Sequence, residues 1–280
     1  MNIVISVNEK FLDISEEAIY SLSYYNNEHI NFYLIYSDIP QNKINSFKKF
    51  VEEKCNNTLY AIKFKLLEAE NIPKILDGIN VGIETYYRLF TPFLLPENID
   101  KVLYMDVDLV CTDSILDIYN EEIGDNYFVG CEDKGITKED LERLKLPLDY
   151  KYINAGVVLI NLKKMRENFT EKKIVEMILE QCKDLRFLDQ DFINKNFYNE
   201  IKVISNKYNW IVKTCKYKDM PYKPAILHYA GSTKPWHDNV NRYENEFIEP
   251  YYKILELEGK IDYLNKLKKI HNEKRLGLNS

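Results

Sequence analysis

The chain alternates short apolar runs with amphipathic segments, and this alternation limits its fold more than any other feature. The apolar runs expected to form β-strands lie at residues 2–7, 31–37, 60–67, 101–107, 127–131, 153–162 and 201–205. Helices are expected between them, over residues 13–25, after Pro40, from Glu84, over residues 170–183 and over residues 188–197. Strands separated by helices indicate an α/β fold with a single, mainly parallel Rossmann-like sheet that helices flank on both faces. Ligands of such sheets bind beyond the carboxyl ends of the strands.

The run at residues 101–107 ends in two carboxylates, Asp106 and Asp108, with Val107 between them. Side chains alternate along a strand, so the two carboxylates are expected on one face, about 6–7 Å apart. Like charges at that spacing repel one another unless a positive group lies between them. A hard divalent cation would supply that charge, and the alternative is a pair of solvated acidic residues in a turn.

The sequence lacks the glycine motifs that cradle phosphates: no GxGxxG follows the first strand and no GxxxxGK[ST] occurs. A nucleotide diphosphate would therefore need a metal ion, which the two carboxylates could hold. A second constellation, at residues 225–237, has His228 at the end of a short apolar strand, then Gly231 in a turn and Lys234. An imidazole suits Mn²⁺ better than Mg²⁺, and an ammonium can bind a phosphate oxygen. An ordinary packed histidine is the alternative for His228.

Composition excludes several classes of protein. The 280 residues are 45% hydrophobic and carry a net charge of −6, so they can bury a sizeable core but offer no basic face for nucleic acid. The five cysteines are odd in number and form no CxxC pair, which argues against a disulfide framework and a structural zinc site. No signal peptide and no run of about 18 apolar residues is visible, so a soluble, cytoplasmic protein is expected.

Five motifs, in this order, resemble those of glycosyltransferase family 8: YxRL at Arg88, KVLYMDVD, YINAGVVLINL, LDQDFIN and HYAGSTKPWH. The resemblance covers about residues 1–240. The family includes glycogenin and bacterial α-galactosyl- and glucosyltransferases that act on lipooligosaccharide or glycoprotein glycans. The resemblance implies a GT-A fold, a UDP-hexose donor (galactose or glucose), Mn²⁺ with Mg²⁺ as an alternative, and a saccharide, glycolipid or glycoprotein acceptor. It also implies transfer that retains the anomeric configuration.

The resemblance further implies roles for individual residues. Asp106, Asp108 and His228 match the metal ligands, while Gly231 and Lys234 match the turn that binds the diphosphate. The residues expected around the rest of the donor are Arg88, Asp106, Val107, Asp133, Asn154, Asp189 and Gln190. Carboxylates, amides and a guanidinium supply the paired donors and acceptors that sugar hydroxyls need. A turn amide and a polar residue on a helix face are the alternatives for Asn154 and Gln190.

Three of the implied roles concern uracil and catalysis. Asn8 matches the position that holds uracil, where relatives commonly have an acidic residue; its amide can still pair with uracil N3–H and O4, and a turn residue is the alternative. Gln190 matches the face of the anomeric carbon away from UDP. An amide is a poor base and a poor nucleophile, which favours attack from the side of the departing UDP. Asp189 is the fallback nucleophile.

The last part of the chain is expected to form a separate element. Residues 1–245 are the expected catalytic domain, and residues 246–280 a helical extension. Apolar residues recur every three positions from Ile261, with lysines mostly elsewhere, which predicts an amphipathic basic helix. Such a helix could contact the inner face of an anionic membrane or a glycan-assembly partner, and the alternative is packing on the domain.

Two other functions are compatible with the residues alone. A metal-dependent nucleotidyltransferase or phosphohydrolase also uses paired aspartates, normally with further carboxylates or a basic loop. A non-catalytic nucleotide-sugar-binding protein would have a broken metal set, whereas Asp106, Asp108 and His228 are all present.

Overall fold

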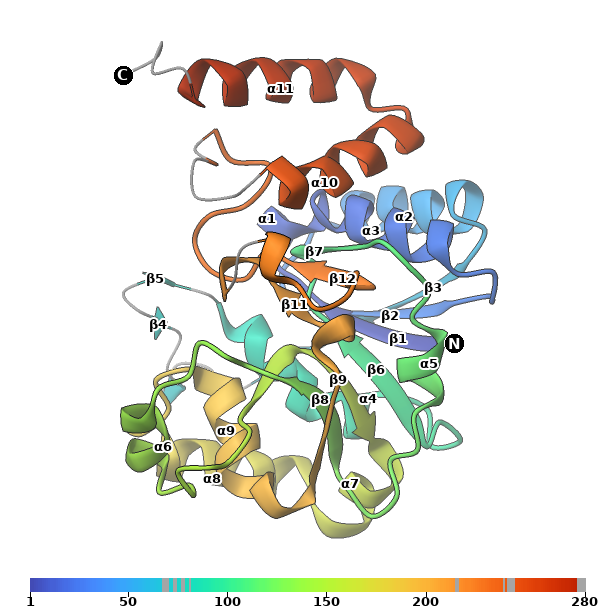
Figure 1. The fold of residues 1–280 in the computed structure, drawn as a ribbon. Coiled ribbons are helices and arrows are strands. Elements are labelled where there is room, and N and C mark those ends of the chain that lie inside the picture. Colours follow the sequence, from blue (N-terminus) through green and yellow to red (C-terminus); the bar gives the residue numbers. More distant parts are fainter. Residues whose placement is uncertain are drawn as a thin grey trace.

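A seven-stranded sheet forms the centre of the molecule (Figure 1). The computed structural model describes residues 1–66, 71–72, 75–76, 79–80, 82–214, 217–238, 240 and 245–275. The strand order is β10 (Ile201–Ile204), β8 (Phe128–Glu132), β9 (Ile153–Asn161), β6 (Lys101–Met105), β1 (Asn2–Ser6), β2 (Asn31–Tyr36) and β3 (Thr58–Lys63). All neighbours pair in parallel except β9, which runs antiparallel to both β6 and β8. The predicted mainly parallel sheet is confirmed.

Helices cover both faces of this sheet, as the sequence predicts. Ile3 and Ile5 of β1 belong to a buried cluster shared with α2 (Ser15–Tyr25) and α3 (Gln41–Lys49). Val4, between them, belongs to a second cluster shared with α8 (Glu171–Gln181) and α9 (Leu188–Phe197) on the opposite face. Other short elements include α1 (Glu9–Leu12), β4 (Ile75–Leu76), β5 (Ile79–Asn80), α4 (Thr91–Leu94), α5 (Leu116–Asn120), α6 (Lys138–Leu144) and α7 (Leu162–Asn168).

A smaller three-stranded sheet lies beside the carboxyl ends of the central strands. It consists of β11 (Trp210–Ile211), β12 (Ile226–His228) and β7 (Leu109–Cys111), with β7 antiparallel to β12. The expectation of one continuous strand over residues 101–107 is wrong, because β6 ends at Met105. Residues 106–108 form the turn that takes the chain from the central sheet into β7. This turn, and not the alternation of a strand, sets the positions of the two aspartates.

Strand β9 is irregular where it passes the carboxyl end of β8. Gly130 pairs with Val158, yet the next residue, Cys131, pairs with Asn154. The three residues of β9 between these two pairs therefore have no pairing partner on β8. Bulges of this kind bend a strand and redirect its side chains, and they are common next to active sites. The bulge contains Ala155 and Gly156, at the carboxyl end of β6.

Several element bounds differ from the sequence-based prediction. The third strand covers Thr58–Lys63 instead of residues 60–67. The helix expected from Glu84 is a 3₁₀ helix over Ile83–Phe90, followed by α4, whose first turn contains Pro92. The helix LDQDFINKNF agrees with α9 at both ends.

Two helices, α10 (Asn245–Glu258) and α11 (Ile261–Arg275), complete the chain. Gly259, with a φ of 85°, ends α10 and turns the chain into α11. Leu264 and Leu267 of α11 are buried in a cluster with α10, whereas Ile261 is 44% exposed. This packing agrees with the alternative in which the helix lies on the folded chain. Within the described ranges, no helix is both long and apolar enough to cross a membrane.

Helix α10 also packs against α2 and β7 (Figure 1). The division of the chain at residue 245 stays a prediction. The last five residues of the predicted extension, 276–280, lie outside the described residues.

Candidate active site

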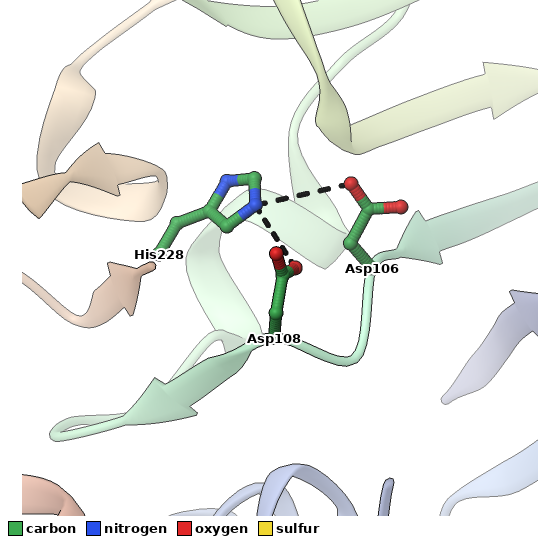
Figure 2. A group of neighbouring side chains, drawn as sticks. All are labelled: Asp106, Asp108 and His228. Carbon is green, nitrogen blue, oxygen red and sulfur yellow. Dashed lines mark hydrogen bonds and ion pairs between the residues drawn. The ribbon is translucent and has the colours of Figure 1, made fainter. Parts of the chain in front are cut away.

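Three side chains with metal-ligand chemistry converge where the two sheets meet (Figure 2). Asp106 follows β6, Asp108 precedes β7 and His228 ends β12. The Nε2 atom of His228 lies 3.1 Å from Asp108 Oδ1 and 3.8 Å from Asp106 Oδ2. One ligand atom of each residue lies within 4.8 Å of the others. The structure therefore brings together the three residues that the sequence identifies as candidate ligands.

Backbone hydrogen bonds hold the aspartate turn in this position. The N–H of Asp106 donates to the carbonyl of Gly156 at 2.7 Å, and the N–H of Tyr229 donates to the carbonyl of Asp108 at 2.9 Å. The turn is thus fixed to the bulged part of β9 on one side and to the chain after His228 on the other. Because backbone hydrogen bonds anchor the turn on both sides, the two carboxylates have little freedom to separate.

Gly156 has no side chain, and this leaves room for His228 and Asp106. A Cβ atom at this position would lie 2.3 Å from Cε1 of His228 and 2.7 Å from Oδ2 of Asp106. The first of these is a ring atom of a histidine that is only 2% exposed, so it cannot move aside easily. The glycine in the YINAGVVLINL motif therefore has a steric function at the site.

Lys234 supplies positive charge to the cluster. Its buried ammonium forms an ion pair with Asp108 and donates a hydrogen bond of 2.8 Å to the carbonyl of Tyr229. Burial would raise the pKa of Asp108, but the charge of Lys234 and the contact with His228 hold that pKa well below its usual range. Asp108 is therefore an ionised acceptor.

Arg88 forms ion pairs with two carboxylates, one of which belongs to the candidate metal ligand Asp106. Its NH2 is 3.0 Å from Asp106 Oδ1, and its Nε is 2.8 Å from Asp189 Oδ2. Its NH1 donates to the carbonyl of Ala155, and its guanidinium lies over the ring of Tyr104, 4.2 Å from the centroid. Burial would lower the pKa of Arg88, but the charges of Asp106 and Asp189 outweigh burial and raise that pKa, so the side chain stays charged.

Asp189, at the start of α9, is buried and only partly satisfied. The hydroxyl of Thr85 donates to its Oδ1. The single N–H at Arg88 Nε donates to the carbonyl of Thr85, so Oδ2 has an ion-pair partner but no directed hydrogen bond from the described residues. Burial raises the pKa of Asp189 to about 6, although Arg88 and Thr85 oppose the shift. The Oδ2 atom is itself buried, so the ion pair with Arg88, and not water, balances its charge.

A chain of side-chain amides connects the metal-ligand cluster to the predicted sugar-binding residues. Nδ1 of His228 is 2.8 Å from Oδ1 of Asn209, whose Nδ2 donates to Asn154 Oδ1 at 2.9 Å. Asn154 Nδ2 donates to Gln190 Oε1 at 2.8 Å. The side-chain NH₂ groups of Asn154 and Gln190 also donate to Oδ2 of Asp133, each at 3.2 Å. The predicted residues Asp133, Asn154 and Gln190 thus form one network with the candidate metal ligand.

The other predicted donor residues have local contacts. Asn8 follows β1 and its Oδ1 accepts from the N–H of Lys10, so it caps α1, as the turn-residue alternative expects. Val107 is 7% exposed and packs in the cluster beneath α2, so only its backbone can face a ligand. Gly231 has a φ of 99° in the turn after β12, a conformation that favours glycine. Their roles stay predictions.

Sequence reasoning missed Asn209, Thr85 and Tyr104. Tyr104 has the appearance of a core residue in the run KVLYM, although its hydroxyl lies 3.2 Å from Asp106 Oδ1. Thr85 directly precedes the YxRL motif, a position that could have marked it, and its hydroxyl donates to Asp189 at the start of α9. Asn209 lies in a loop before β11, where no local pattern distinguishes it.

Comparison with known proteins gives relatives that are similar in sequence. The chain is 29% identical over 208 residues to a lipopolysaccharide 1,2-glucosyltransferase of Escherichia coli, covering 69% of this chain and 61% of that protein. It is 27% identical over 184 residues to a lipopolysaccharide 1,3-galactosyltransferase of Salmonella typhimurium, covering 61% and 55%. The chain thus spans little more than half the length of these two relatives.

The galactosyltransferase LgtC, solved with donor and acceptor sugar analogues, superposes with a TM-score of 0.77. The identity is 23%, and the match covers 90% of this chain and 96% of LgtC. This likeness confirms the GT-A fold. The model of the family described as Glycosyl transferase family 8 matches residues 2–240, which is most of the chain. The chain therefore belongs to glycosyltransferase family 8.

Proposed function

We propose that this chain transfers a hexose, galactose or glucose, from a UDP-sugar to a saccharide or glycan acceptor in a reaction that requires a divalent cation. The convergence of Asp106, Asp108 and His228 beside a buried polar network carries the proposal. The names of the two lipopolysaccharide glycosyltransferases among the relatives support the same class of chemistry. A saccharide, glycolipid or glycoprotein would be the acceptor.

The three converging residues fit a divalent cation. They offer two carboxylate oxygens and one imidazole nitrogen within 4.8 Å of one another, and Gly156 keeps the space beside them free of a side chain. A mixed oxygen and nitrogen set suits Mn²⁺, with Mg²⁺ as the alternative. A cation bound there would neutralise a diphosphate and stabilise UDP as a leaving group.

The residues next to the cluster would bind the rest of the donor. Lys234, beside Asp108, would bind a phosphate oxygen. Asp133 and Asp189 would accept sugar hydroxyls, since carboxylates are acceptors only. Arg88 would contribute mainly by fixing Asp106 and Asp189, since each nitrogen of its guanidinium already contacts the protein. Asn8 would bind uracil.

We infer a retaining reaction in which the acceptor hydroxyl attacks the anomeric carbon from the side of the departing UDP. The bond from that carbon to UDP breaks, and the hydroxyl proton passes to the diphosphate. Asp189 is 4% exposed and held by Arg88 and Thr85, which makes it a poor covalent nucleophile. Gln190 is half-buried, and its Oε1 accepts two N–H groups, from Asn154 and Ala155. An amide oxygen held in this way offers a fixed dipole that would stabilise an oxocarbenium-like centre.

A donor screen tests the proposal. The protein is incubated with Mn²⁺, Mg²⁺ or EDTA and with UDP-galactose, UDP-glucose, nucleoside triphosphates or phosphomonoesters, and UDP or phosphate release is measured. Metal-dependent UDP release from a UDP-hexose, increased by a saccharide acceptor, is expected. Release from triphosphates or monoesters instead would indicate a nucleotidyltransferase or phosphohydrolase. Binding of UDP-hexose without release or transfer would indicate a non-catalytic binding protein.

The proposed chemistry also bears on the location of the protein in the cell. We propose a cytoplasmic enzyme, since nucleotide sugars are donors inside the cell and the cysteines form no pairing pattern. A peripheral membrane contact through α11 gains no support from its packing, because Leu264 and Leu267 face α10.

A further inference from the structure

A buried asparagine outside the sequence motifs contacts the candidate metal-ligating histidine. Asn209 is 0% exposed and lies between the 3₁₀ turn at Asn206–Tyr208 and β11. Its Oδ1 lies 2.8 Å from His228 Nδ1, and its Nδ2 lies 2.9 Å from Asn154 Oδ1. Both polar ends of its side chain therefore contact residues of the candidate active site.

Backbone N–H groups decide the direction of every hydrogen bond in this chain of amides. The N–H of Gly156 donates to Asn154 at 2.9 Å, so the atom that receives it is the carbonyl oxygen Oδ1. The N–H of Ala155 donates to Gln190 at 3.1 Å, which identifies Oε1 in the same way. A backbone N–H can only donate, so neither side-chain amide can be reversed without losing a hydrogen bond.

This polarity extends to the histidine. Because Asn154 presents its oxygen, Asn209 must present its NH₂ group to it and its own oxygen to His228. An amide oxygen accepts only, so Nδ1 of His228 carries a hydrogen. The other ring nitrogen, Nε2, is the one that faces Asp106 and Asp108 (Figure 2). A histidine that binds a metal through Nε2 needs its hydrogen on Nδ1, and the partner of that hydrogen fixes the ring.

We propose that Asn209 is a positioning residue: it holds the hydrogen of His228 on Nδ1, directs Nε2 to the two aspartates, and links this orientation through Asn154 to Gln190. The catalytic consequence rests on the proposed function, whereas the protonation of Nδ1 does not. Preorganised ligands of this kind bind a cation more tightly, because no reorientation accompanies binding. Loss of such an outer partner typically weakens metal affinity or activity by about 10- to 100-fold.

The first test uses the metal-free protein. Long-range ¹H–¹⁵N correlation spectra of histidine-labelled protein identify which ring nitrogens carry hydrogen, and His228→Ala assigns the His228 signals among the four histidines. A solvent-protected hydrogen on Nδ1 of His228 is expected in the wild type, and its loss or rapid exchange in Asn209→Leu. A wild-type Nδ1 without hydrogen would overturn the proposal, and so would an Nδ1–H that stays protected in Asn209→Leu.

A matched control separates this effect from general destabilisation. Asn57 is also buried, and its side chain accepts from the N–H of Ile30 and donates to Ser23, far from the site. Asn57→Leu makes the same chemical change and is expected to lower the melting temperature while leaving the Nδ1–H of His228 unaltered.

The second test measures Mn²⁺ binding by electron paramagnetic resonance at a fixed concentration of UDP. Asn209→Leu is expected to weaken Mn²⁺ binding by about 10- to 100-fold relative to both the wild type and Asn57→Leu. Equal affinity in the wild type and Asn209→Leu would contradict the proposal. A wild type that binds no Mn²⁺ with UDP would refute the metal site in the proposed function, while the NMR result would still decide the role of Asn209.

Discussion

Replacing Gly156 with alanine tests whether close packing at the bulge of β9 sets the geometry of the metal-ligand cluster. The added Cβ would lie 2.3 Å from His228 Cε1 and 2.7 Å from Asp106 Oδ2, whereas ordinary contacts begin at 3.4 Å. Relief of the first contact needs a displacement of about 1 Å. The ring is held at Nδ1 by Asn209, so the displacement separates Nε2 from the two carboxylates.

The expected magnitude follows from that displacement. Metal–ligand distances are satisfied only within about 0.2 Å, and a misplacement of about 1 Å in a catalytic site can reduce activity about 100-fold. We therefore expect Gly156→Ala to weaken Mn²⁺ binding at least tenfold and to lower kcat/KM by about 100-fold. Overpacking also lowers the free energy of unfolding by about 1–3 kcal/mol.

The assay compares Gly156→Ala with Gly130→Ala on the neighbouring strand. A Cβ at Gly130 would lie 2.8 Å from Cδ1 of Ile153, and its three nearest atoms belong to the core side chains of Ile153 and Val158. Both variants should lose similar stability in urea unfolding, but only Gly156→Ala should lose Mn²⁺ affinity in the presence of UDP. Wild-type Mn²⁺ affinity in Gly156→Ala would refute the reasoning.

Three further predictions concern catalysis and pH. Gln190→Ala should slow transfer without abolishing it, since its amide is expected to stabilise charge and not to form a bond; complete inactivity of a well-folded variant would contradict this. The anomeric proton of the product, observed by NMR, should report an α linkage from an α-linked UDP-hexose, and a β linkage would refute retention. Burial raises the pKa of Glu17 from 4.5 to about 7, although Lys260 opposes the shift. The folded protein therefore favours protonated Glu17. The stability that this protonated carboxyl contributes to the wild type is fully present below about pH 4.5 and is lost as the pH rises through about 7. Glu17→Gln should accordingly gain stability relative to the wild type between about pH 5 and pH 8 in urea unfolding, and a relative loss would have the wrong sign.

Much of the fold could be predicted from the sequence, because burial on both faces of the sheet imposes patterns that are visible locally. The strands and most helices could be located from the apolar runs and the breaks between them. Within a strand, successive residues such as Ile3, Val4 and Ile5 pack on alternating faces of the sheet. The direction of β9 could not be predicted in this way. Its residues are buried on both faces, and a continuous apolar run does not indicate whether a strand is parallel or antiparallel to its neighbours.

The site was predictable where chemistry and spacing coincide. Asp106 and Asp108 stand out because charges follow an apolar strand, and His228 because it ends another. The turn over residues 106–108 was not predictable, because it depends on the pairing of β7 with β12, a strand that lies more than 100 residues further along the chain. The contacts of Asn209 could not be predicted for the same reason, because its two partners, His228 and Asn154, come from distant parts of the chain.

The most direct measurement of the central claim is UDP release from UDP-galactose and UDP-glucose, with Mn²⁺ or EDTA, by the wild type and by the double variant Asp106→Asn/Asp108→Asn. These substitutions keep the shape of both side chains but remove the charges expected to hold the cation. We predict Mn²⁺-dependent release by the wild type and none above background by the double variant, with circular dichroism confirming that the variant is folded. Undiminished release by the double variant, or release by the wild type that EDTA leaves unchanged, would contradict the assignment of the metal centre.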